Sequence, residues 1–226
     1  MQRDPFGIFI PHRERLSVAL FTKEDRIRSD QGRRAAEALD ATDFASLQQA
    51  HGNTTVVVRA PSDRHIPADG LLTDTPGLAL LTRSADCQSL VMYAPEKHIA
   101  GVLHAGWRGL DGGVIGGFFE VLKDTFAIDP EDTLVGIAPS LCAACACFTD
   151  PAHECANIDP RFYKGRCIDL RSAADRMLRD LGVLPENIER LPGCTRCEPD
   201  RYWTYRGGDR EAVKGGQTNV LACVLA

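Results

Sequence analysis

The sequence predicts an α/β (α+β) fold in which residues 1–226 form a single domain of mixed β-sheets flanked by helices. Strand-like segments alternate with segments that have apolar residues at helical spacing, and some strand-like segments follow one another as in hairpins. This pattern is typical of a mixed sheet covered by helices. The chain has 44% hydrophobic and 25% charged residues, the composition of a soluble globular protein, and it is long enough to bury a core without disulfides.

The first half of the chain contains most of the expected strands. The segments GIFI and VALFT have the pattern of two short strands of a hairpin or meander. Apolar residues between positions 31 and 50 fit a helix that breaks near 40–43 and continues as a second helix. The β-branched run TTVVV at 54–58 predicts a buried strand, and LALLT, LVMYA and IAGVL predict three more.

The second half alternates helices with strands. Apolar residues at helical spacing predict a helix from about residue 110 to residue 125, behind a glycine-rich turn. TLVGIA predicts a strand, and the cysteine-rich CAACACF that follows predicts a loop. CIDL is strand-like and leads into a helix that we expect to end at Gly182. WTYRG and TNVLACVL are the last two expected strands.

Charge and hydropathy exclude some classes of partner. The net charge is −5, so the chain lacks the basic surface typical of proteins that bind nucleic acid. It has neither a signal sequence nor an uninterrupted apolar run of ~18 residues. We therefore expect a cytoplasmic protein with no membrane and no nucleic-acid partner. The sequence does not indicate the oligomeric state.

Three residues at strand ends could form a metal site. His51 lies where a strand begins, Cys87 between two strand-like runs, and His104 where a strand ends. Two imidazoles and one thiolate suit a catalytic zinc that keeps its fourth position for water, and such a zinc lowers the pKa of that water toward ~7. Asp86 could then orient a ligand or carry a proton. Because the three residues are dispersed, the alternative that they are structural stays open.

The stretch LHAGWRGLDGG indicates an anion site beside these residues. The helix after the glycines would direct its free N–H groups toward His104. Arg108 and Arg83 could hold phosphate by paired hydrogen bonds, and Trp107 could stack on a base. A glycine-rich turn with a buried tryptophan is the structural alternative.

The nine cysteines are an odd number, so at least one is unpaired, and in a reducing compartment we expect thiols or metal ligands before disulfides. Six of the eight in the second half of the chain could form a structural zinc or iron–sulfur site: Cys142, Cys145, Cys147, Cys155, Cys194 and Cys197. The two C-x-x-C pairs lie far apart in the sequence. This separation favours unpaired buried thiols, and no second metal is assigned.

Five motifs occur in an order that resembles a known family: AHG, ADG, LTRSADCQSLVMY, IAGVLHAGWRGL and IAPSL. They are similar to those of the YfiH or laccase-domain family, known as purine nucleoside phosphorylases and earlier as multicopper polyphenol oxidases. The resemblance is strong from about Gln48 to Ser140. It implies a compact YfiH-like fold, which has also been compared with that of Cys–His hydrolases.

The resemblance also implies a function and a set of site residues. The metal would be zinc, held by His51, Cys87 and His104. The substrates would be purine nucleosides and phosphate, with phosphorolysis of adenosine, inosine and methylthioadenosine and deamination of adenosine.

The roles of individual residues follow as hypotheses. Asp86, with Cys87 and His104, would belong to the catalytic set, with Asp86 moving protons during deamination. Arg83 and Arg108 would hold phosphate, so replacing either should raise the phosphate requirement. Asn53 would hydrogen-bond the ligand.

Three segments depart from the family pattern, and other functions stay open. FTKEDRIRSDQ replaces a Gly-Gly-Val-Ser stretch, a tyrosine and a glutamate are missing around Ala146, and GGQTN replaces Thr-Gly-Arg. One alternative is a metal-free Cys–His hydrolase or deamidase with Cys87 as nucleophile and His104 as base. A copper-dependent polyphenol oxidase has little support from only six histidines. The last alternative is a non-catalytic binding module.

Overall fold

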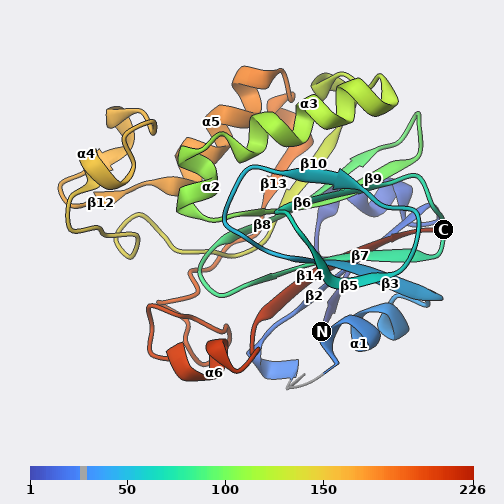
Figure 1. The fold of residues 1–226 in the computed structure, drawn as a ribbon, viewed down its shortest axis with the longest axis horizontal. Helices are drawn as coiled ribbons and strands as arrows, with labels where there is room; N and C mark the ends of the chain where they lie inside the picture. Colours follow the sequence, from blue (N-terminus) through green and yellow to red (C-terminus); the bar gives the residue numbers. More distant parts are fainter. Residues whose placement is uncertain (26–29) are drawn as a thin grey trace.

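Two six-stranded sheets form the centre of the molecule, which we describe from a computed structural model covering residues 1–25 and 30–226 (Figure 1). The first sheet has the order β1 (Gln2–Arg3), β2 (Leu16–Phe21), β14 (Asn219–Leu225), β7 (Leu78–Ser84), β3 (Asp43–Gln48), β5 (Ser62–Pro67). The second has the order β13 (Ile188–Arg190), β10 (Leu134–Ile137), β8 (Gln88–Ala94), β9 (Ile99–Ala105), β6 (Gly70–Thr73), β4 (Thr55–Val57). Both sheets mix parallel and antiparallel pairs, as predicted.

Helices cover the outer faces of the two sheets. The α-helices are α1 (Gln31–Ala38), α2 (Trp107–Asp111), α3 (Val114–Phe126), α4 (Pro151–Glu154), α5 (Leu170–Leu181) and α6 (Arg210–Lys214). Short 3-10 helices are η1 (Gly7–His12), η2 (Lys23–Asp25), η3 (Pro130–Asp132), η4 (Pro160–Phe162) and η5 (Pro185–Asn187), and β11 (Tyr163–Lys164) pairs with β12 (Cys167–Ile168). Figure 1 shows α3 and α5 on one side of the sheets and α1 on the other.

The alternation of side chains along the strands builds three apolar layers. On β2, Leu16, Val18 and Leu20 pack between the sheets, whereas Ala19 and Phe21 pack under α1. β8 behaves likewise: Val91 and Tyr93 join the layer between the sheets, and the residues that alternate with them pack under α3. Because the central strands are buried on both faces, they form the continuous apolar runs that identified them in the sequence.

Three predicted elements differ in the structure. GIFI is part of η1 rather than a strand, because Phe6 and Phe9, three residues apart, both turn inward and pack edge to face with 5.6 Å between their ring centroids. The expected second helix after position 43 is instead β3, which inserts Ala45 and Leu47 between the sheets. WTYRG forms turns and no strand.

Two further expectations are refined. The helix expected from 110 to 125 is two helices, α2 and α3, separated at Gly112–Gly113, where Gly113 has a φ of 78°. α5 ends at Gly182 as predicted, with a φ of 109°. Part of the departing segment FTKEDRIRSDQ, residues 26–29, lies outside the described residues. Among the described helices, none has the length and apolar character needed to cross a membrane.

Candidate metal centre and cavity

Neighbouring strand ends bring His51, Cys87 and His104 together. β8 and β9 are antiparallel neighbours with Ser89 opposite His104, so Cys87, just before β8, lies beside the end of β9. The loop before β4 carries His51 to the same place. The ligand atoms of the three residues all lie within 4.8 Å of one another. The structure therefore assembles the dispersed residues into a group that could hold a metal ion.

The backbone beside the group leaves room for three converging side chains. A Cβ atom placed on Gly106 would lie 2.9 Å from Cδ2 of His51 and 3.1 Å from Sγ of Cys87. The rings of His51 and His104 meet edge to face, with 4.8 Å between their centroids. Glycine at position 106 of HAGWRG is thus required by space, since its own φ of −70° is available to any residue.

Asp69 holds both histidines in place. One carboxylate oxygen accepts a hydrogen bond from Nδ1 of His104 at 2.8 Å and one from the backbone N–H of His51 at 3.0 Å, and the other accepts from Gly52 N–H at 2.7 Å. Because Nδ1 of His104 is engaged, Nε2 is the nitrogen that is free for a metal. A carboxylate behind a histidine ligand is a common outer partner at metal sites, where it fixes the ring and raises its basicity.

Cys87 and His104 form a strongly interacting pair. Burial alone would raise the pKa of the Cys87 thiol, but the charge of His104 and hydrogen bonds from both histidines outweigh it and lower the pKa to about 6. Burial alone would lower the pKa of His104, but the Cys87 thiolate and Asp69 raise it to about 9. At neutral pH Cys87 is therefore a thiolate, the form that binds metals and acts as a nucleophile.

Asp86 faces away from this group, toward the C-terminal part of the chain. Its carboxylate accepts hydrogen bonds from the hydroxyls of Thr195 at 2.8 Å and Thr204 at 2.6 Å and from the backbone N–H of Arg206 at 2.7 Å. Its φ of 90° is rare for a residue with a side chain. This backbone conformation orients two consecutive side chains toward different partners, Asp86 toward the loop and Cys87 toward the histidines.

A cavity of about 740 Å³ opens beside the metal-ligand group and includes all three residues in its wall. Among the described residues, one acid, Asp86, lines it, against one lysine and five arginines: Lys214, Arg64, Arg83, Arg108, Arg206 and Arg210. The chain as a whole carries a net charge of −5, so this concentration of cations is local. Such a cavity attracts an anion.

Arg83 is buried in the cavity wall and incompletely paired. Its Nε donates to Gln31 at 3.1 Å and its Nη2 reaches Asp63 at 3.5 Å, but Nη1 is buried without a hydrogen-bond partner among the described residues. Burial and the nearby charge of Arg64 lower the pKa of Arg83 to about 10. Two guanidinium groups this close favour an anion between them.

The other predicted substrate contacts lie in different places. Arg108 is exposed and stacks on Trp107, with its Cζ 4.0 Å from the ring centroid, and both residues line the cavity. Asn53 is not among the described residues that line it, and its side-chain amide donates to the carbonyl of Gly112 at 3.0 Å. A direct contact from Asn53 to a ligand stays a prediction.

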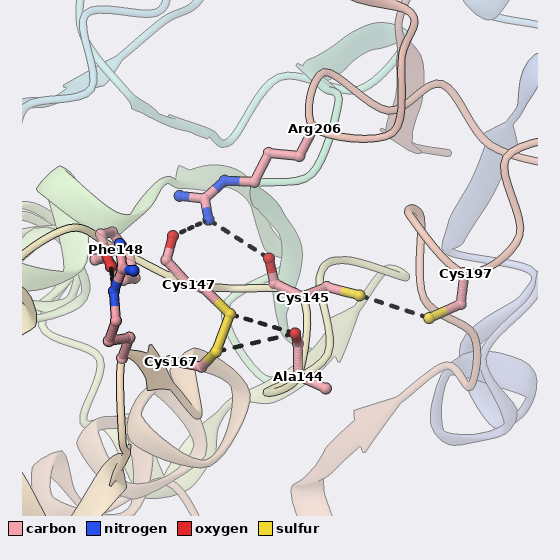
Figure 2. Close-up of a disulfide and its surroundings, with 8 residues drawn as sticks. Ala144, Cys145, Cys147, Phe148, Cys167, Cys197 and Arg206 are labelled. Atoms are coloured by element: carbon pink, nitrogen blue, oxygen red, sulfur yellow. Dashed lines mark hydrogen bonds between the residues drawn. A yellow bond between two sulfur atoms is a disulfide. The ribbon is translucent and has the colours of Figure 1, made fainter.

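The cysteines of the second half have several states. Cys147 and Cys167 form a disulfide, so the expectation of thiols was wrong for this pair, which an isolated antiparallel bridge between the two residues brings together (Figure 2). Cys155 and Cys223 are buried free thiols. The two C-x-x-C pairs meet in space in spite of their separation in the sequence.

The sequence assigned no role to two residues that support the candidate site. Asp69 belongs to the quoted ADG motif, and an acid between two strand-like segments is the signal that could have identified it as the partner of His104. Arg206 lies in WTYRG, which was interpreted as a strand. Its contacts with Asp86 come from backbone geometry that no local pattern reveals.

Comparison with known proteins identifies the family of the chain. The family model described as "Multi-copper polyphenol oxidoreductase laccase" matches residues 14–223. The human protein named purine nucleoside phosphorylase LACC1 is 31% identical over 183 residues, which are 75% of this chain and 41% of the human protein. The chain therefore spans less than half the length of that relative, and the aligned part is 54% of the Geobacillus stearothermophilus phosphorylase named YlmD.

Solved structures have the same fold. The crystal structure of YlmD from Geobacillus stearothermophilus superposes with a TM-score of 0.78 at 25% identity, covering 97% of this chain and 93% of that one. That of Bacillus licheniformis hypothetical protein YfiH has a TM-score of 0.80 at 20% identity, covering 96% and 94%. The match of the family model over nearly the whole chain, with this shared fold, shows that the chain belongs to the laccase-domain family, the family of YfiH and YlmD.

Proposed function

We propose that this chain is a zinc-dependent purine nucleoside phosphorylase that acts on adenosine, inosine and methylthioadenosine, with adenosine deaminase activity as a second reaction. The observation that carries the proposal is a metal-ligand group in the wall of a cation-rich cavity. Its volume of about 740 Å³ is suited to a nucleoside with phosphate. The names of the relatives point to the same reaction.

The donor set fits zinc. Two imidazoles and one thiolate would hold the ion and leave one position for water or substrate, as in catalytic zinc sites, and Asp69 would be the outer partner of His104. A zinc ion there would supply Lewis acidity at neutral pH. Copper fits less well, because a multicopper centre needs many histidines and the chain has six in all.

Phosphorolysis asks the chain to hold phosphate beside the sugar. A phosphate oxygen bonds to C1′ of the ribose while the bond from C1′ to the purine nitrogen breaks, and the electron pair leaves with the base, which takes up a proton. Arg83, with its unpaired buried Nη1, and Arg108, exposed at the rim, are suited to bind phosphate through charge-assisted hydrogen bonds. This fixes the nucleophile and neutralises its charge.

The purine needs an aromatic surface and a proton source. Trp107 and Tyr205 both line the cavity and could stack on the base. Deamination adds water at the ring carbon that bears the amine and releases ammonia, so it too needs a residue that moves protons. Asp86 is the proposed proton carrier, although its three hydrogen bonds to the C-terminal loop also suit a positioning role.

The test is a pair of measurements on protein purified without added metal. The zinc content is measured for the wild type and for Cys87→Ser, and each nucleoside is incubated with and without phosphate while free base and sugar phosphate are quantified. We expect about one zinc to be lost in the variant, together with release of base that depends on phosphate. Formation of inosine from adenosine without phosphate reports deamination.

Substitutions separate the roles within the site. Arg83→Gln should raise KM for phosphate about tenfold or more, as expected when a charged hydrogen bond is lost. Arg59→Gln is the matched control, because that arginine pairs with Asp74 on the surface. Metal-free protein with rapidly alkylated Cys87 would favour the Cys–His hydrolase instead. Bound copper would favour the oxidase, and absence of stabilisation by any nucleoside would favour a binding module.

A further inference from the structure

Four cysteines lie together outside the candidate site. Cys142 and Cys145 form one C-x-x-C pair and Cys194 and Cys197 another, and we refer to the four as the cysteine quartet. Their sulfur atoms all lie within 4.8 Å of one another, although the pairs are about fifty residues apart in the sequence. All four are free thiols. Figure 2 shows the sulfurs of Cys145 and Cys197 facing each other from two separate segments.

The spacing of the sulfurs matches one tetrahedral metal ion. With zinc–sulfur bonds of about 2.3 Å, sulfurs at the corners of a tetrahedron lie about 3.8 Å apart. The distance between the sulfurs of Cys145 and Cys197 is 3.6 Å, and that between Cys142 and Cys197 is 4.0 Å. A cluster of two or four irons would distribute its cysteines over separate iron atoms and needs a wider group.

The two C-x-x-C segments have the same local conformation. The carbonyl of Cys142 accepts from the N–H of Ala146 at 3.1 Å, and the carbonyl of Cys194 accepts from the N–H of Glu198 at 2.9 Å. Each turn therefore places the two sulfurs of its pair on one side. A backbone N–H, that of Cys142, also donates to Sγ of Cys194 at 3.2 Å. Such a hydrogen bond stabilises a thiolate, which is the form that binds metal.

The loop that carries the second C-x-x-C pair has little regular secondary structure to fix it. Residues 191–209 contain no helix and, apart from an isolated bridge at Cys194, no strand. The apolar cluster around the quartet has four buried members among the described residues: Leu141, Cys145, Ala146 and Cys194. Hydrogen bonds to Asp86 anchor the loop at Thr195, Thr204 and Arg206, and a metal ion held by the quartet would add a second anchor at Cys194 and Cys197. Cys197 is exposed, so a metal ion can reach the quartet from solvent.

We propose that the cysteine quartet binds one structural zinc ion that fastens the loop 191–209 to the segment 141–148. The consequence reaches the candidate site through two contacts. Thr195, between Cys194 and Cys197, donates to Asp86, and the guanidinium of Arg206 donates to the carbonyl of Cys147 at 2.5 Å. The zinc would thus fix the wall of the cavity that contains Tyr205 and Arg206. This proposal does not depend on the proposed function, because the quartet shares no residue with the metal-ligand group.

Metal stoichiometry in four proteins tests the proposal. The full chain, Cys87→Ser, Cys197→Ser and the double variant are purified without added metal, and zinc and iron are measured by mass spectrometry. We expect about two zinc ions per chain in the wild type, about one in each single variant and none in the double variant. Cys197 is exposed, so serine should be tolerated there, and Cys155→Ser is a control that should lose no metal.

A second measurement does not require a variant. Cobalt added to metal-depleted wild type should give the intense thiolate-to-cobalt absorption of a four-sulfur site, and Cys197→Ser should weaken it while Cys87→Ser preserves most of it. Three results would overturn the proposal: equal metal content in Cys197→Ser and the wild type, iron as the bound metal, or disulfides within the quartet in peptide maps of the unreduced protein. Loss of zinc only at Cys87 would support the proposed function and refute this site.

Discussion

Replacing Asp69 by asparagine tests how far one buried carboxylate controls the candidate metal centre. The carboxylate accepts three hydrogen bonds, from His104 Nδ1 and from the backbone N–H groups of His51 and Gly52, and it is 1% exposed. Asparagine has nearly the same shape, but it loses the charge and turns one acceptor into a donor that faces an N–H. The ring of His104 would lose its fixed orientation, and the backbone at His51 would lose an anchor.

The expected loss follows from the behaviour of outer partners at metal sites. Removing such a carboxylate typically weakens metal binding 10–100-fold, about 1.4–2.7 kcal/mol. We therefore expect the dissociation constant of zinc at the His51, Cys87 and His104 site to rise by about this factor. The affinity is measured by competition with a chromophoric chelator, in a Cys197→Ser background so that the quartet does not contribute.

A matched surface substitution gives the control. Asp74 pairs with Arg59 in an exposed position, so Asp74→Asn should leave the zinc affinity unchanged. If Asp69→Asn bound zinc within about twofold of its parent, the three hydrogen bonds would not be orienting the ligands and the reasoning would fail. A loss of equal size in Asp74→Asn would trace the effect to general instability.

Four further predictions use the same geometry. Burial opposes ionisation of Asp69, but its hydrogen bonds outweigh burial and lower its pKa. The ionised carboxylate therefore stabilises the folded protein above the unfolded pKa of about 3.9. The difference in unfolding free energy between metal-free wild type and Asp69→Asn should shrink as pH falls below this value. Gly106→Ala should lose metal because its Cβ collides with two ligands, whereas Gly116→Ala, where nothing lies within 4 Å, should keep it. Iodoacetamide should alkylate Cys87 at neutral pH only after chelation, because without metal the pKa of the Cys87 thiol is about 6. An equal rate of alkylation before and after chelation would argue against a bound ion. Chelation should also speed the cleavage by trypsin after Arg196, an exposed residue between two quartet cysteines, because the loop would loosen without its metal; an unchanged rate would contradict the structural zinc.

The strands of the centre could be predicted because they are buried on both faces. LVMYA and IAGVL form apolar runs since their alternate residues enter two different apolar layers. The same two-sided burial explains the wrong helix at β3, where Phe44 and Leu47 fit a helical spacing in the sequence. In the structure Ala45 and Leu47 pack between the sheets, and Phe44 packs on the other face, under α1. Local pattern cannot separate these cases, because tertiary packing decides them.

The candidate site could be predicted only in part. His51, Cys87 and His104 were found from their positions at strand ends and from the resemblance, and the structure places them together. The ring orientation of His104 depends on Asp69, whose hydrogen bonds follow from the pairing of β6 with β9. The cysteine quartet was assigned to unpaired thiols because its pairs are distant in the sequence. A parallel bridge between Ser140 and Cys194 brings them together, and no local signal announces such a contact.

The adjacent residues Asp86 and Cys87 link the two sulfur-containing groups. Cys87 points to the histidines, and Asp86 accepts hydrogen bonds from Thr195, which lies within the quartet's second C-x-x-C segment. A φ of 90° at Asp86 directs the side chains of Asp86 and Cys87 to different sides. A shift of the loop 191–209 would therefore reach Cys87 through Asp86. A zinc in the quartet would therefore steady the thiolate of the candidate centre without touching substrate. Loss of that zinc should alter the affinity of the candidate centre for its own metal ion, which makes the two sites energetically coupled though chemically separate.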